Sequence, residues 1–171
     1  MKRSGQAGLF LLCMIIYYPC AAELSDSKTF TLQGRVIASP CMVEQPTINV
    51  NLGNDIKMSD LATAGSFSDW VAFDIRIYNC PIQYTLATIT FNGTSDSTDP
   101  DFRYQNSGTA TNVAVELRAT DGTPLGNGKS MTGIIANQEF TWNLHTRIWT
   151  ETGYVRPGTV SAVVSATLTY Q

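Results

Sequence analysis

Residues 160–171 read VSAVVSATLTYQ, and this stretch decides how the rest of the chain is interpreted. Its even-numbered positions are apolar, and its odd-numbered positions mostly carry hydroxyl groups. The apolar positions are Val160, Ala162, Val164, Ala166, Leu168 and Tyr170. Alternation with a period of two predicts a long β-strand, beginning at Gly158, with one buried face. Only Gln171 follows it, so we expect no later strand of this chain to cover it.

The same alternation recurs through the chain, which predicts an all-β fold. It appears at residues 47–52, 71–78, 84–91, 113–118 and 140–144. Turn-forming pairs and triplets such as Asn92-Gly93, Asp121-Gly122 and Gly126-Asn127-Gly128 separate these stretches. Only residues 58–65 suggest a short helical turn. Short alternating strands between frequent turns favour an antiparallel sandwich over a parallel sheet.

The first 22 residues have the pattern of a secretory signal peptide. Lys2 and Arg3 precede an apolar run over residues 9–18, and small residues end the segment at Ala22. A lipoprotein anchor on Cys20 is the alternative, but the bulky sequence YYP at 17–19 is a poor approach to such a site. We therefore expect residues 1–22 to be removed and the mature chain to begin at Glu23.

Composition excludes several classes of protein. The 171 residues are 43% apolar and only 15% charged, which suits one folded domain and argues against disorder. The net charge is −3, and loss of Lys2 and Arg3 with the signal takes it to −5, so nucleic acid is not an expected partner. The mature chain has no apolar run of the roughly 18 residues that a membrane-spanning helix needs.

Two cysteines remain after the signal is removed. Cys13 and Cys20 leave with it, whereas Cys41 and Cys80 stay. Two cysteines in an exported domain most simply form one disulfide. The chain has no CxxC pair and a single histidine, His145, so we expect no zinc site.

The start of the mature chain contains a further alternating stretch. Phe30, Leu32, Gly34 and Val36 share one face, with a glycine set among apolar side chains. By periodicity alone this segment could pair within its own sheet. The residues themselves leave open whether this segment packs within its own domain or against another polypeptide.

Four segments, taken in order, resemble pilus subunits of the bacterial chaperone–usher class, most nearly the minor tip subunits of type 1 fimbriae. They are TFTLQGRV at 29–36 before Cys41, INVNLG at 48–53, FDIRIYNC at 73–80, and the closing stretch from Gly158 to Gln171 with its penultimate tyrosine. Together they span nearly all of the mature chain. Residues 94–107 carry no motif of that family.

The resemblance implies an incomplete immunoglobulin-like antiparallel β-sandwich that lacks its last strand. Residues 23–37 would be an N-terminal donor-strand extension and residues 38–171 the pilin domain. Phe30, Leu32 and Val36 would then fill pockets of a neighbouring subunit, while Gly34 permits close backbone approach. The strand from Val160 to Tyr170 would form a wall of this chain's own groove. The carboxylate of Gln171 would bind basic residues of the chaperone.

The implied function is a structural subunit of an adhesive fimbria, assembled by donor-strand exchange and placed as a minor or tip adaptor. Its implied partners are a periplasmic chaperone, the outer-membrane usher and neighbouring subunits, and its location is the bacterial surface, reached through the periplasm. No cofactor and no enzymatic activity are expected. A host-ligand-binding adhesin and a free periplasmic β-sandwich binding module are the alternatives.

Other candidate groups have simpler interpretations. Asp96, Asp99 and Asp101 could offer oxygen ligands to calcium, but their spacing fits no EF-hand, and a solvated loop is expected. His145 has no catalytic partner motif and is expected to be a structural or surface residue. The chain's tryptophans could form a sugar platform, although core packing is the favoured interpretation. They are Trp70, Trp142 and Trp149.

Overall fold

The computed structural model describes Gln33 and residues 40–171. The expected signal peptide and the face formed by Phe30, Leu32, Gly34 and Val36 lie outside the described residues. In the described part of the chain, no helix is long and apolar enough to span a membrane.

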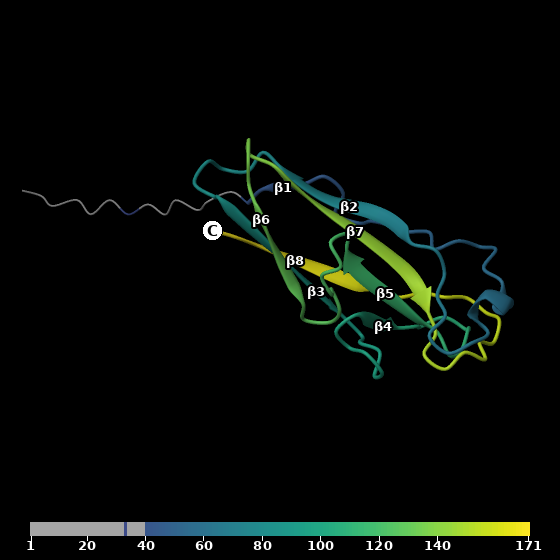
Figure 1. Ribbon diagram of the computed structural model, residues 1–171. Helices are drawn as coiled ribbons and strands as arrows, with labels where there is room; N and C mark the ends of the chain where they lie inside the picture. The colour runs from purple at the N-terminus through teal and green to yellow at the C-terminus, as the bar shows by residue number, and fades with distance from the viewer. Residues whose placement is uncertain (1–32, 34–39) are drawn as a thin grey trace, which may run out of the picture. The chain divides into compact units, whose positions relative to one another are not determined.

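Two antiparallel sheets make up the domain (Figure 1). The five-stranded sheet has the order β1-β2-β7-β5-β4, and the three-stranded sheet has the order β6-β3-β8. The strands are β1 (Met42–Val43), β2 (Val71–Tyr78), β3 (Leu86–Gly93), β4 (Arg103–Gln105), β5 (Ala114–Ala119), β6 (Ser130–Ile134), β7 (Phe140–Trp149) and β8 (Val164–Tyr170). A short 3-10 helix, η1 (Met58–Leu61), is the helical turn that the sequence indicates. The all-β antiparallel prediction is therefore confirmed.

The alternating positions of the long strands meet in one core between the sheets. Ile75 and Ile77 of β2, Ile89 of β3, and Trp142 and Leu144 of β7 are at most 9% exposed. Burying a side chain of this size contributes about 1.5–3 kcal/mol. The period-two pattern thus identifies the core face of each of these strands correctly.

Two segments expected to be strands differ in the structure. Residues 47–52 form no strand, although Ile48 and Leu52 are packed against core residues. They pair with no neighbouring strand within the described residues. The C-terminal strand begins at Val164 instead of Gly158, because the backbone before it bonds to the segment that follows β4. Ala110 N donates to Thr159 O at 3.0 Å.

This crossing of two backbones requires small residues. A Cβ atom at Gly108 would overlap the backbone of Thr159, and one at Gly158 would overlap the backbone of Ala110. Asn106 strengthens the crossing by accepting a hydrogen bond from Ser161 N at 2.8 Å. Residues 158–161 therefore leave the direction of β8 and are fixed to the loop after β4.

Candidate strand-acceptor groove

The last strand, β8, lies at the edge of the three-stranded sheet (Figure 1). It pairs with β3 along its full length, from Ala87 opposite Tyr170 to Gly93 opposite Val164. Among residues 40–171, no second strand pairs with it. As far as the described residues go, its other side is an open sheet edge.

The register determines which backbone groups face this edge. Gln171 and Leu86 exchange two hydrogen bonds, each 2.9 Å long. In an antiparallel ladder such pairs alternate with pairs that exchange none, so the odd-numbered residues of β8 direct their N–H and C=O groups toward β3. The even-numbered residues direct theirs to the open edge. They are Val164, Ala166, Leu168 and Tyr170.

The side chains of the same even-numbered residues point to the inside of the sandwich. Val164, Leu168 and Tyr170 pack against the core but stay partly exposed, and Ala166 is exposed. The ring of Tyr170 lies 5.6 Å from that of Tyr84, centroid to centroid. Partial burial, and secondarily the nearby Tyr84, raise the pKa of Tyr170. The inner face of β8 is therefore apolar and incompletely covered.

The segment after β1 packs onto the same core. Ile48, like Val43 at the end of β1, contacts the main cluster, and Leu52 and Ile56 contact a smaller cluster around Leu61. The backbone of this segment bonds to β2 at Glu44, whose N–H donates to Arg76 O at 3.0 Å. Beyond that point it belongs to no sheet in the described residues. It supplies apolar side chains but leaves the edge of β8 unpaired.

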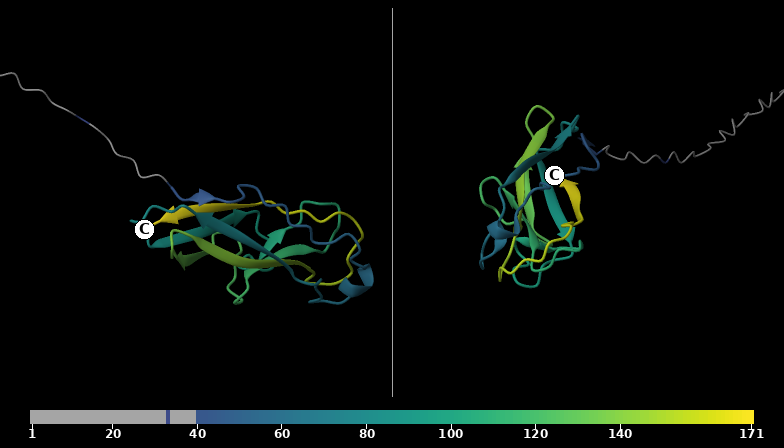
Figure 2. Two further views of the ribbon diagram at one scale, coloured as in Figure 1. Left: turned by 90° about the horizontal axis from the view of Figure 1, so that it is seen from above. Right: turned by 90° about the vertical axis from the view of Figure 1, so that its right-hand side faces the viewer.

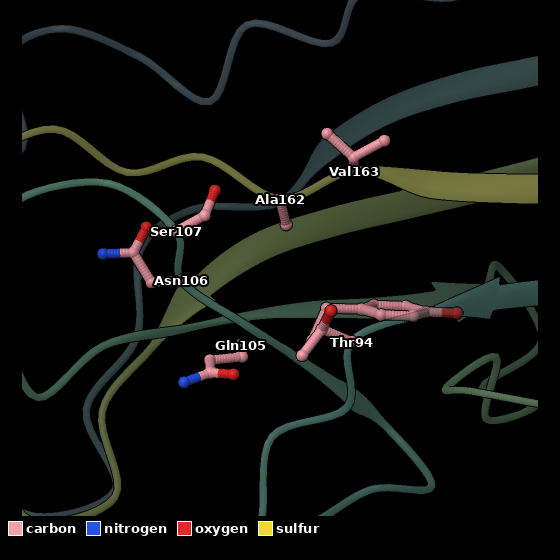
Figure 3. Close-up of a pocket in the computed structure, with 7 residues that line it drawn as sticks. Thr94, Gln105, Asn106, Ser107, Ala162 and Val163 are labelled. Carbon is pink, nitrogen blue, oxygen red and sulfur yellow. The ribbon is translucent and has the colours of Figure 1, made fainter.

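A hollow of about 370 Å³ lies where β8 begins (Figure 3). Ala162 and Val163 form one side of it, and Val163 is 80% exposed. The remaining lining comes from the start of the loop after β3 and from β4 with the residues that follow. These are Thr94, Tyr104, Gln105, Asn106 and Ser107. The hollow continues the surface of β8 before its first paired residue, with apolar lining from Ala162 and Val163 and polar lining from the residues opposite.

The predicted disulfide is present and joins Cys41 to Cys80, with the two Cα atoms 4.2 Å apart. It fastens the residue before β1 to the residue that follows Asn79 at the end of β2. Closing a loop of this length stabilises the fold by about 4 kcal/mol in the chain-entropy picture. The start of the segment after β1 is thereby fixed to the five-stranded sheet.

The acidic loop is neutralised by side chains of the domain itself. Asp99 lies 3.4 Å from Arg103, Asp101 lies 2.9 Å from Lys129, and Asp96 accepts a hydrogen bond from Thr98 N. Within residues 40–171, no group of histidine, cysteine, aspartate and glutamate is arranged to hold a metal ion. These carboxylates act as ion-pair partners and turn caps.

The tryptophans have two different environments. Trp142 is 1% exposed in the core, as expected, but Trp70 and Trp149 lie on the outer face of the five-stranded sheet, so core packing is wrong for them. There Arg147 lies 4.1 Å from the Trp70 ring and pairs with the fully buried Glu116. His145 stacks on Trp70 at 3.8 Å, a structural role.

The sequence analysis did not predict this cluster of aromatic and charged side chains on the outer face of the five-stranded sheet. The sign of it in the sequence is a charged residue at an outward position of β5 and of β7, namely Glu116 and Arg147. A charge at an outward position ordinarily indicates solvent. The aromatic residues that cover this pair, Phe67 and Trp70, come from a segment before β2 that no local pattern links to the outer face.

Comparison with known proteins identifies the family. The profile of the family described as Fimbrial protein matches residues 30–171. The chain is 33% identical over 163 residues to Protein FimG of Escherichia coli K12, covering 94% of this chain and 95% of FimG. It is 35% identical over 152 residues to the S-fimbrial adhesin protein SfaS of Escherichia coli O6:K15:H31 strain 536, covering 88% of each chain.

Solved structures of pilus subunits share the fold. The P pilus rod subunit PapA superposes with a TM-score of 0.67 at 20% identity, over 78% of this chain and all of PapA. A type I fimbria protein of Burkholderia pseudomallei gives a TM-score of 0.58 at 30% identity, over 78% of this chain and 91% of its own. The immunoglobulin-like sandwich expected from the resemblance is therefore present. By sequence and by fold, the chain belongs to the fimbrial protein family.

Proposed function

We propose that this chain is a structural subunit of an adhesive fimbria, that it serves as a minor or tip adaptor, and that another polypeptide completes its fold. The observation that carries the proposal is the open edge of β8. Val164, Ala166, Leu168 and Tyr170 each offer N–H and C=O groups to that edge and an incompletely covered side chain to the interior.

An edge of this kind is unfavourable when it stays open. Each buried backbone group without a partner costs about 1–3 kcal/mol, and an unpaired edge is a template for association with other chains. An added strand removes both costs, because its backbone completes the ladder and its alternate side chains enter the interior. Such strand addition is the way in which pilus chaperones complement pilins.

Residues 23–37 are the proposed donor strand for a neighbouring subunit, with residues 1–22 as the signal and 38–171 as the acceptor domain. Phe30, Leu32 and Val36 would enter the neighbour's interior, and Gly34 would lie where a side chain does not fit. In the periplasm a chaperone strand would occupy this chain's own groove. At the outer-membrane usher, the extension of another subunit would replace it, which places the protein in a surface fimbrium.

A second candidate function is that of an adhesin that itself contacts a host ligand. The similarity to SfaS, whose name describes it as an adhesin, favours this candidate. The two functions separate in a binding assay. An adaptor mounted in fimbriae without its tip partner would not confer binding to host cells, whereas an adhesin would.

The test of strand acceptance is co-expression of the chain with the chaperone from its own gene cluster, followed by co-purification. Ala166→Asp places a charge on the inner face of β8, at an alanine that is exposed. We expect it to abolish the chaperone complex. Thr167→Asp is the matched control, because Thr167 points to the opposite face. Equal recovery of the two variants would contradict the proposal.

A further inference from the structure

Several of the exposed large apolar side chains lie at the two ends of the domain. Three of them lie around the disulfide: Met42 is 51% exposed, Ile82 is 85% exposed and Ile134 is 71% exposed. We call this region, which also contains Pro40 and Gln171, the disulfide end. It is the end at which the label C stands in Figure 2.

These three residues lie near one another along the strand ends and turns around the disulfide. Met42 Sδ lies 3.5 Å from Asn79 Nδ2, and Asn79 precedes the disulfide cysteine Cys80. Ile82 follows in the turn that Tyr84 N closes by donating to Pro81 O. Ile134 pairs with Leu86 at the beginning of β3. The three belong to strand ends and turns that meet at one end of the sandwich.

A cluster of charged groups borders this end. Arg76 lies 2.6 Å from Glu139 and 3.4 Å from Glu44, and hydrogen bonding to Glu139 is the main cause that raises the pKa of Arg76. Apolar side chains bordered by charged ones are typical of a protein–protein contact surface.

The chain itself indicates what lies against this end. The domain begins beside Cys41, and under the proposed function residues 23–37 occupy the groove of a neighbouring subunit. Only residues 38–40 then connect the two domains. Three extended residues span at most about 10 Å. The neighbour must therefore lie within that distance of the disulfide end.

The direction of the added strand determines which part of the neighbour is involved. Every ladder between named strands of this domain is antiparallel. β8 runs toward the disulfide end, so an antiparallel donor leaves the groove at the other end of the domain. We call that other end, which contains η1, the η1 end (Figure 1). It also exposes apolar groups: Met58 is 55% exposed and Tyr154 is 83% exposed, and Tyr154 N donates to Ala62 O at 3.4 Å.

We propose that the disulfide end, through Met42, Ile82 and Ile134, packs against the η1 end of the fimbrial subunit that receives this chain's N-terminal strand. This contact rests on the proposed function and adds a second surface to it. The arrangement is head-to-tail, so it extends along a fibre instead of closing a ring.

A contact of three side chains is too small to join free subunits, since stable interfaces bury more than about 1,000 Å². The inserted strand changes this, because it holds the two surfaces at high effective concentration. The contact therefore forms only between linked subunits, where it limits their relative bending.

The test places the photo-crosslinking amino acid p-benzoylphenylalanine at position 82 of the full chain, expressed with its chaperone, usher and neighbouring subunits. The matched control carries it at position 143, because Asn143 is exposed in the middle of β7. In isolated fimbriae we expect position 82 to crosslink severalfold more than position 143, with the attached peptide from the η1 end of a fimbrial subunit. Equal crosslinking, none at position 82, or attachment elsewhere on the neighbour would overturn the contact.

Incorporation into fimbriae separates the two proposals. Chains that enter fimbriae but fail to crosslink at position 82 contradict only the contact, whereas a wild-type chain that never enters fimbriae removes the proposed function and the contact with it.

A second measurement uses Ile82→Glu with Ile134→Glu. Because both side chains are exposed, the domain should still fold, and electron microscopy of chains that enter fimbriae should show wider angles between linked subunits. Asn143→Glu is the control, and unaltered angles in the double variant would count against the contact.

Discussion

Strands β7 and β8 have the same alternating pattern but different surroundings. β7 lies between β2 and β5, and its inward residues Trp142 and Leu144 are 1% and 0% exposed. β8 has only β3 beside it within the described residues, and its inward Leu168 and Tyr170 remain partly exposed. Apolar residues alternate in both, although Thr146 and the outward Trp149 interrupt the pattern in β7 and nothing interrupts it in β8.

The difference shows that alternation specifies the face of a strand, whereas the number of neighbouring strands specifies how far that face is buried. β7 is complete within the domain. β8 also has an apolar inner face, but this face stays partly exposed within the described residues, which is what a strand needs if it is to accept a partner on its other side.

The strongest way to remove the difference is to supply the missing neighbour. A copy of residues 24–37 joined after Gln171 through a short flexible linker should convert an unstable, aggregation-prone chain into a soluble monomer. Burial of Phe30, Leu32 and Val36 alone should stabilise it by about 5 kcal/mol or more. Urea unfolding and size-exclusion chromatography of the fused and unfused chains measure the effect. An unfused chain that is monomeric and equally stable would show that β8 needs no added neighbouring strand.

Leucine truncation then compares the two strands directly. In the fused chain, Leu144→Ala in β7 should cost about 2–5 kcal/mol, as expected for a fully buried leucine. Leu168→Ala in β8 should cost clearly less in the chaperone-free, unfused chain, and should approach the Leu144→Ala value once the added strand covers it. Urea midpoints of the variants in both chains provide the data. If Leu168→Ala lowers the free energy of unfolding equally with and without the added strand, Leu168 does not line the groove.

The sequence predicts the strand faces well because period-two alternation is a local property. Ile77, Ile89 and Leu144 are buried as that pattern requires. It does not predict β4, which has three residues in a polar loop, or the course of residues 158–161, which depends on backbone bonds to residues around Ala110. Nor does it predict the cover over Glu116, because Phe67 and Trp70 reach it only through tertiary packing.

Gly34→Arg tests whether the N-terminal segment serves this chain's own fold or a neighbour's β8 edge. If it serves a neighbour, folding and chaperone-bound yield should be nearly unchanged, and incorporation into fimbriae should fall sharply. The reason is that the arginine side chain would overpack a site with room only for the hydrogen atom of glycine, at a cost of about 1–3 kcal/mol or more. Yield and incorporation are measured in parallel, with Gln33→Arg as the control on the opposite face. Loss of both quantities, or of neither, would contradict assignment of this segment to a partner.

The smallest expected effect comes from the outer face of β7, which is covered by the domain itself. Burial, followed by the charges of Arg118 and Arg147, lowers the pKa of His145 from its usual 6.5, against the opposing influence of Glu116. The unfolded chain therefore takes up a proton first, and the free energy of unfolding should decrease as the pH falls below 6.5 toward the lower folded value. His145→Gln in the fused chain should flatten this part of the stability profile, while leaving stability near pH 8 little changed. Urea unfolding at a series of pH values from 8 to 5 gives the comparison. Parallel stability profiles for the two chains would mean that the surroundings of His145 on the outer face do not lower its pKa.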